Sequence, residues 1–149
     1  MAEAGEGGRP LRFVPLAAPP ELPPQRLCAS SELEEKGLAF LFDTLHFHEP
    51  QRAFALRFEG RVVAYLNRCV HVPTEMDWQP GEFLDSAREF ILCSIHGAAY
   101  DPRSGQCIGG PCGRGKLAPL SAHEEDGSVW WQPTRDTRPA PAKAAASPV

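Results

Sequence analysis

The sequence predicts an all-β fold, a small antiparallel barrel or sandwich in a single domain. The chain has 149 residues, enough for one domain with its own core. Roughly eight short apolar or β-branched segments are separated by closely spaced turns, a pattern typical of such folds. Sixteen prolines, about twice the usual share, indicate a loop-rich chain.

Turn signals bound the expected elements along the chain. Glu59-Gly60 separates two apolar runs and predicts a tight hairpin whose second strand leads directly into Asn67. Serines before acidic residues favour one helical turn within 27–33, and the polar, proline-containing segment 43–52 is expected to be a loop. The expected strands are 11–16, 39–42, 53–58, 61–66, 89–92, 98–100, 106–108, 117–120 and 128–131.

The two ends differ in composition from the middle of the chain. Residues 1–10 are rich in Gly and Glu and are expected to form a disordered lead. From 133 to 149 the chain is rich in Pro and Ala, which indicates a flexible tail. We therefore expect the folded domain to span 11–132.

Charge and composition exclude several classes of function. The net charge of −4, without a basic run, argues against nucleic-acid binding. No apolar run approaches the roughly twenty residues of a membrane span, and no export signal is visible, so we expect a cytoplasmic, monomeric protein. The acidity fits a carrier that docks on a basic patch of a partner. It fits equally well a surface that is acidic only for solubility.

The most informative residues are two cysteine-histidine pairs, Cys69-Val70-His71 and Cys93-Ser94-Ile95-His96. They supply two thiolates and two imidazoles on separate loops, which is the ligand set of a Rieske [2Fe-2S] centre. Structural zinc uses the same residue types but usually pairs Cys with Cys and His with His, so mixed pairs favour iron and sulfide. The alternative that none of the four binds a metal is weaker, because such spacing is not a common accident.

The chain resembles the Rieske iron-sulfur domain family, most of all its small soluble ferredoxins, from about Leu11 to Gln132. Besides the two pairs, Tyr100-Asp101-x-x-Ser104-Gly105 and Gly109-Gly110-Pro111 are similar to family motifs. The resemblance implies an antiparallel base with an inserted cluster-binding subdomain, formed by loops at about 67–78 and 91–112. It also implies one [2Fe-2S] cluster per chain, held by Cys69, His71, Cys93 and His96, with a proline loop covering it.

The function implied by the resemblance is electron transfer rather than catalysis. We expect a one-electron carrier between a flavin-dependent reductase and a terminal oxygenase or similar enzyme, without a substrate site of its own. One alternative is an accessory subunit held in a reductase or oxygenase complex. Another is a zinc-stabilised interaction module.

The sequence departs from the high-potential members of the family at three positions. Thr74 and Ile95 stand where those proteins carry an additional cysteine pair, and Ala98 stands where they carry a serine that donates to a sulfide. Fewer donors leave the reduced cluster less stabilised, so we expect a potential near the low end of the Rieske range, about −150 mV.

The remaining cysteines and histidines are expected to have structural roles. Cys107 and Cys112 could close a small disulfide, but a reducing compartment favours two thiols. Cys28 is expected in the core. His46 and His48, with Glu49 and His123, could form a second metal site, although packing and solvent exposure are the simpler interpretation.

Overall fold

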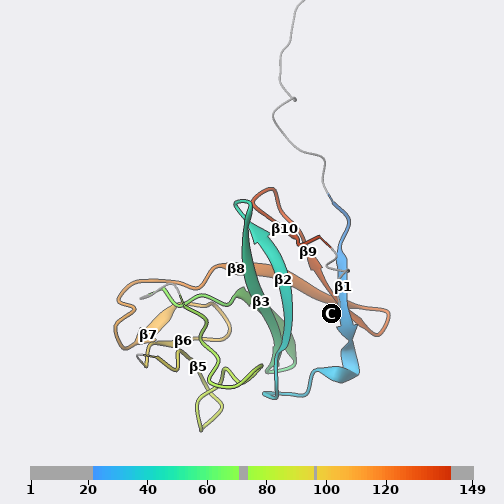
Figure 1. Ribbon diagram of the computed structural model, residues 1–149. Coiled ribbons are helices and arrows are strands. Elements are labelled where there is room, and N and C mark those ends of the chain that lie inside the picture. Colours follow the sequence, from blue (N-terminus) through green and yellow to red (C-terminus); the bar gives the residue numbers. More distant parts are fainter. Residues whose placement is uncertain (1–21, 71–73, 96, 142–149) are drawn as a thin grey trace, which may run out of the picture.

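The computed structural model describes residues 22–70, 74–95 and 97–141, and the folded chain is built almost entirely of strands (Figure 1). This confirms the all-β prediction. The only helical element among the described residues is a 3₁₀ turn at Ser30–Glu32, inside the segment expected to form one helical turn. The strands are β1 (Gln25–Ala29), β2 (Phe40–His46), β3 (Glu49–Phe58), β4 (Arg61–Leu66), β5 (Ile91–Leu92), β6 (Ala99–Tyr100), β7 (Cys107–Gly109), β8 (Pro119–Glu125), β9 (Ser128–Gln132) and β10 (Thr137–Pro139).

The larger sheet has seven antiparallel strands in the order β1-β9-β8-β4-β3-β2-β10 and curls into a barrel-like shape. The two ends of the sheet approach each other, since Cys28 of β1 and Phe40 of β2 pack in one apolar cluster. Near closure leaves little strand edge exposed to other chains.

The hairpin predicted around Glu59-Gly60 is confirmed as β3 and β4. Both turn residues have positive φ, 54° and 79°, as a type I′ turn requires. Strand β3 is buried on both faces because Phe54 packs in the larger core cluster while Ala53 and Ala55 pack in a second cluster. Strand β4 ends at Leu66 and passes directly into the first ligand loop.

The prediction of a loop at 43–52 is wrong, because β2 and β3 extend through this segment as a two-stranded ribbon. The ribbon turns at Phe47 and His48, which both have positive φ. Its residues are polar because it extends beyond the core, and the Thr44 hydroxyl donates to the Gln51 carbonyl at 2.6 Å. The polar, proline-containing composition that predicted a loop here thus belongs to a hairpin that extends toward solvent.

The prediction of a flexible tail from residue 133 onward is also wrong in part, because Thr137–Pro139 form β10 and pair with β2. Thr137 is 4% exposed, and its hydroxyl lies 2.7 Å from Nδ1 of His46. This pairing depends on a partner strand that the sequence assigned to a loop. The expected strand at 11–16 and the expected lead at 1–10 lie outside the described residues.

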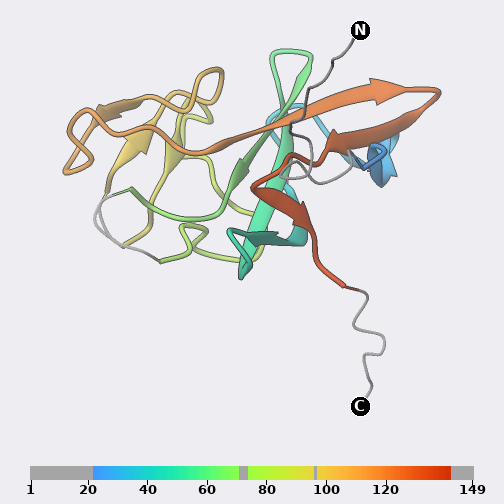
Figure 2. The same cartoon turned by 90° about the horizontal axis from the view of Figure 1, so that it is seen from above.

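A second, three-stranded sheet, β5-β6-β7, forms the inserted subdomain beside the barrel (Figure 2). Phe54 of the barrel stacks on Phe83 of the insertion with ring centroids 3.7 Å apart. The buried Tyr65 hydroxyl donates to the Pro102 carbonyl at 2.7 Å, and burial raises the pKa of Tyr65 to about 12. These contacts join the two parts through one continuous core.

Membrane insertion through a helix finds no support in the described part of the chain, where no helix is long and apolar enough to span a bilayer.

Candidate metal centre

Two loops at the far end of the insertion present the cysteines of the predicted ligand set. Cys69 follows β4 and Cys93 follows β5. Each loop is closed in the same way, since the Cys69 amide donates to the Thr74 carbonyl at 2.9 Å and the Cys93 amide to the Ala98 carbonyl at 2.8 Å. His71 and His96, the two imidazoles of the set, lie outside the described residues.

The two cysteines lie inside the larger core cluster, where Cys69 is 2% exposed and Cys93 is fully buried. The two loops then turn toward solvent. Val70 and Ile95, which directly precede His71 and His96 in the sequence, are both exposed. Two thiols held out of water at the end of a rigid sheet suit a metal that is ligated from the protein side by sulfur.

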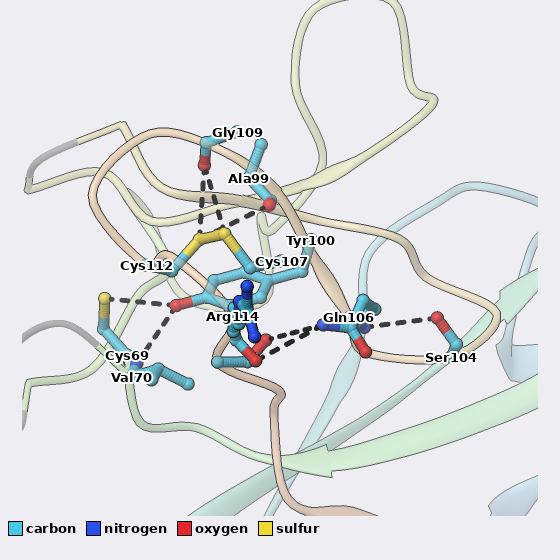
Figure 3. The surroundings of a disulfide bond; sticks show 11 residues. Cys69, Val70, Ala99, Tyr100, Ser104, Gln106, Cys107, Gly109, Cys112 and Arg114 are labelled. Atoms are coloured by element: carbon cyan, nitrogen blue, oxygen red, sulfur yellow. Dashed lines mark hydrogen bonds between the residues drawn. A yellow bond between two sulfur atoms is a disulfide. The ribbon is translucent and has the colours of Figure 1, made fainter.

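Tyr100 places a hydrogen-bond donor against one of these thiols. Its buried hydroxyl accepts from the Val70 amide at 3.0 Å and lies 3.5 Å from Sγ of Cys69, toward which it points in Figure 3. Since the Val70 amide occupies an acceptor position, the hydroxyl proton is available to the sulfur. Burial, followed by the bond to Cys69, raises the pKa of Tyr100, so the group stays a donor at neutral pH.

Asn67 fixes the base of the first ligand loop. Its side chain is 1% exposed, its Oδ1 accepts from the Met76 amide at 2.8 Å, and its Nδ2 donates to Asp77 at 3.0 Å. The Ser94 amide donates to the Met76 carbonyl at 3.0 Å and so ties the second loop to the first. The relative placement of the two loops is therefore set by protein groups alone.

A third loop, 109–115, lies over both ligand loops and corresponds to the expected proline loop. A Cβ added at Gly110 would lie 2.8 Å from the Gly97 carbonyl, and one at Gly115 would lie 2.3 Å from Cγ1 of Val70. Contacts this close mean that only glycine fits where the third loop touches its neighbours. The glycines therefore allow the third loop to lie directly against the two ligand loops, as expected of a covering loop.

The structure joins Cys107 and Cys112 in a disulfide across this loop (Figure 3). The expectation of two reduced thiols is therefore wrong. The chain reverses between the two residues at Gly109-Gly110, which brings their Cα atoms to 5.8 Å, within the range that a disulfide spans. Sequence separation and the inferred compartment did not reveal that reversal.

Replacing Gly110 with alanine should destabilise the protein by about 2 kcal/mol more than the same change at Gly113. Both glycines have positive φ, 80° and 60°, so both variants carry the cost of a left-handed alanine. Only at Gly110 does the new Cβ also press on the backbone of the second ligand loop, since nothing lies within 4 Å at Gly113. Denaturant unfolding followed by circular dichroism measures both; equal losses would contradict the close contact.

The candidate second metal site receives no support from the described residues, among which no group of three or more His, Cys, Asp and Glu side chains could hold a metal. His46 bonds Thr137 and packs edge-on against Phe47, while His48 and His123 are exposed. Cys28 is 2% exposed in a separate cluster, as expected for a core residue.

Fold and site together define a small β protein that presents two buried thiols on paired loops at one end of its scaffold. A family model described as the Rieske [2Fe-2S] domain matches residues 17–130. The chain belongs to the Rieske [2Fe-2S] domain family. The donor set fits the family's cluster on the sulfur side, where Cys69 and Cys93 lie in one core with a hydroxyl donor beside them.

Solved structures share the fold at low sequence identity. The ferredoxin of carbazole 1,9a-dioxygenase from Nocardioides aromaticivorans IC177 is 18% identical, with a TM-score of 0.58 over 74% of this chain and 98% of its own. The terminal oxygenase of carbazole 1,9a-dioxygenase from Novosphingobium sp. KA1 is 22% identical, with a TM-score of 0.57 over 79% of this chain but 31% of its own. A comparison with curated proteins finds no match.

Sequence reasoning missed two residues of the site. Asn67 carried no signal beyond its place before Cys69, and Tyr100 was assigned only to a strand and a motif. A buried tyrosine needs a partner for its hydroxyl, and a strand that returns from the second ligand loop toward the first is where such a partner lies. A tyrosine in such a returning strand was therefore the sequence signal that could have identified Tyr100 as a site residue.

Proposed function

We propose that this protein is a one-electron carrier, a Rieske-type ferredoxin that takes an electron from a flavin-dependent reductase and passes it to a terminal oxygenase or a similar enzyme. The observation that carries the proposal is the burial of Cys69 and Cys93 in the same core cluster, one on each ligand loop. The bound cluster supplies a centre that accepts and releases one electron.

In this proposal Cys69 and Cys93 hold one iron, and His71 and His96 hold the other. The chain's own task is to keep the two thiols desolvated and correctly spaced, which Asn67 and the paired loop closures accomplish. Tyr100 adds a hydroxyl toward one sulfur. One cluster per chain follows from the single pair of motifs in the sequence.

The extent of the structural similarity supports a separate carrier. This chain spans nearly the whole of the carbazole dioxygenase ferredoxin and less than a third of the terminal oxygenase. A second solved structure is a complex of reduced oxygenase and oxidised ferredoxin, matched at 16% identity and a TM-score of 0.57 over 73% of this chain and 92% of that one. We carry over to this chain the same kind of partner, and we propose in addition that the carrier is monomeric.

The test is an absorption and EPR spectrum of the protein purified without oxygen, with iron and acid-labile sulfide counted per chain. We expect about two irons and two sulfides with the spectrum of a mixed thiolate and imidazole cluster. A colourless protein that contains zinc would contradict the proposal. A coloured protein that purifies only with a large partner would replace the free carrier by an accessory subunit.

A further inference from the structure

Exposed cations gather on or next to the loops around the site, although the whole protein is acidic. The chain has a net charge of −4, yet the exposed cations Arg68, Arg114 and Lys116 lie on or next to these loops, against one exposed carboxylate, Glu75. Within the described residues none of these three cations forms an ion pair, whereas Arg52 and Arg57 on the barrel do. Their charge is therefore directed to solvent.

Two of these cations lie at a pocket beside a ligand cysteine. The pocket has a volume of about 290 Å³ and is lined by Arg68, Cys69, Val70 and Lys116 together with His46, Leu66 and Ala118. Arg68 lies on the first ligand loop and Lys116 on the segment that leads to β8, so two separate parts of the chain supply the cations. Glu75 lies elsewhere, in a pocket with Asp43 and Arg52. A carboxylate is the ligand that such a cationic pocket favours.

Next to this pocket the surface is apolar. Val70, Ile95 and Ile108 are 42%, 55% and 48% exposed; Val70 and Ile95 lie on the two ligand loops, and Ile108 lies on β7 directly before the third loop. These loops touch each other at Gly110 and Gly115, so the three side chains belong to one end of the molecule. Protein interfaces commonly combine apolar and charged residues, and both kinds are exposed at this end of the molecule.

Acidic side chains gather at the opposite end. Glu124, Glu125 and Asp126 are exposed at the tip of the β8–β9 hairpin, which projects away from the ligand loops in both views (Figures 1 and 2). The protein thus has a positive end at the site and a negative end far from it. In an acidic partner's field this separation orients the molecule before contact.

We propose that the end formed by Val70, Ile95, Ile108, Arg68, Arg114 and Lys116 docks on an acidic surface of a redox partner protein, with a partner carboxylate entering the pocket between Arg68 and Lys116. This inference rests on the proposed electron-carrier function. It reverses the expectation from net charge, which pointed to a basic partner. A protein is favoured over nucleic acid or lipid because exposed apolar side chains accompany the three cations at this end, whereas phosphate binding calls for a longer basic stripe.

The test uses the cluster-loaded protein and two small oxidants of opposite charge, ferric EDTA and hexaamminecobalt(III). Each takes one electron from the reduced protein, and the rates are followed by stopped flow. Between about 0.01 and about 0.15 M salt, where the Debye length falls from about 30 to about 8 Å, we expect the rate with ferric EDTA to fall and the rate with the cobalt complex to rise. A wild-type rate that rises with salt for the anion would overturn the proposal.

Charge reversal localises the effect. Lys116→Glu and Arg114→Glu should lower the ratio of the anion rate to the cation rate by about threefold or more at low salt. The matched control is Arg61→Glu, which makes the same charge change beside His123 and Glu124 at the acidic end and should leave the ratio nearly constant. The ratio is used because a change in potential affects both rates. Equal effects of all three variants would show that only net charge matters.

Binding gives a readout that does not depend on electron transfer. A column of immobilised poly-L-glutamate should retard the wild type and Arg61→Glu but not Lys116→Glu or Arg114→Glu. Binding to phosphatidylglycerol vesicles without retention on polyglutamate would overturn the choice of a protein partner. A protein that lacks iron and sulfide would fail the earlier test of function, whereas a loaded protein that repels anions would refute only the docking inference.

Discussion

Replacing Cys69 or Cys93 with alanine should abolish the visible and EPR spectra and reduce the iron content at least about tenfold, because the thiolates supply every sulfur ligand from the protein. Both side chains are buried in one core, and no neighbouring described cysteine other than the disulfide pair lies in that cluster to replace them. Iron and sulfide analysis of the purified variants measures the effect. The same loss is expected for His71→Ala and His96→Ala.

The control for this experiment is Cys28→Ala. Cys28 is as buried as Cys69, at 2% exposure, but belongs to a different cluster at β1. Its replacement removes a comparable buried sulfur and should leave iron, sulfide and both spectra unchanged. Retention of a full complement of iron in the Cys69 or Cys93 variant would show that the ligands have been misassigned.

Replacing Tyr100 with phenylalanine should lower the midpoint potential by roughly 40–80 mV, which corresponds to about 1–2 kcal/mol for one electron. The hydroxyl lies 3.5 Å from Sγ of Cys69, and a donor to a ligand sulfur stabilises the reduced form more than the oxidised form, since the reduced form is more negative. A spectroelectrochemical titration measures the shift. Tyr100 thus partly offsets the donor that is missing at Ala98.

Tyr65→Phe separates this effect from the general loss of a buried hydroxyl. Tyr65 donates to the Pro102 carbonyl rather than to a sulfur, so its removal should cost about 1–3 kcal/mol of unfolding free energy and leave the potential nearly constant. Equal shifts of potential in the two variants would mean that packing, not the bond to Cys69, sets the value.

The parts of the fold that were predicted correctly are those in which local chemistry decides the outcome. Glu59 and Gly60 both adopt positive φ and close a tight turn, and the runs on either side of them are apolar enough to be strands. The ribbon through Phe47 and His48 and the strand β10 are different, because polar residues there are ordered by pairing with one another. Single-sequence patterns carry little information about such pairings.

The same division holds at the site. The cysteine ligands were predicted from a spacing typical of metal sites, and the covering loop was implied by the family resemblance. The Tyr100 bond and the Cys107–Cys112 disulfide depend on how a chain reversal and a returning strand meet in space. The charge of the docking end was hidden for a related reason, since a net value of −4 averages over both ends of the molecule.

The Asn67 side chain has a consequence for the maturation of the protein. Because its amide is bonded to Met76 and Asp77, the first ligand loop is closed by hydrogen bonds that require no iron. Bonds made within the polypeptide lower the ordering entropy that cluster binding would otherwise have to supply at Met76 and Asp77. Asn67 thereby shifts part of the cost of building the site from cluster binding to folding.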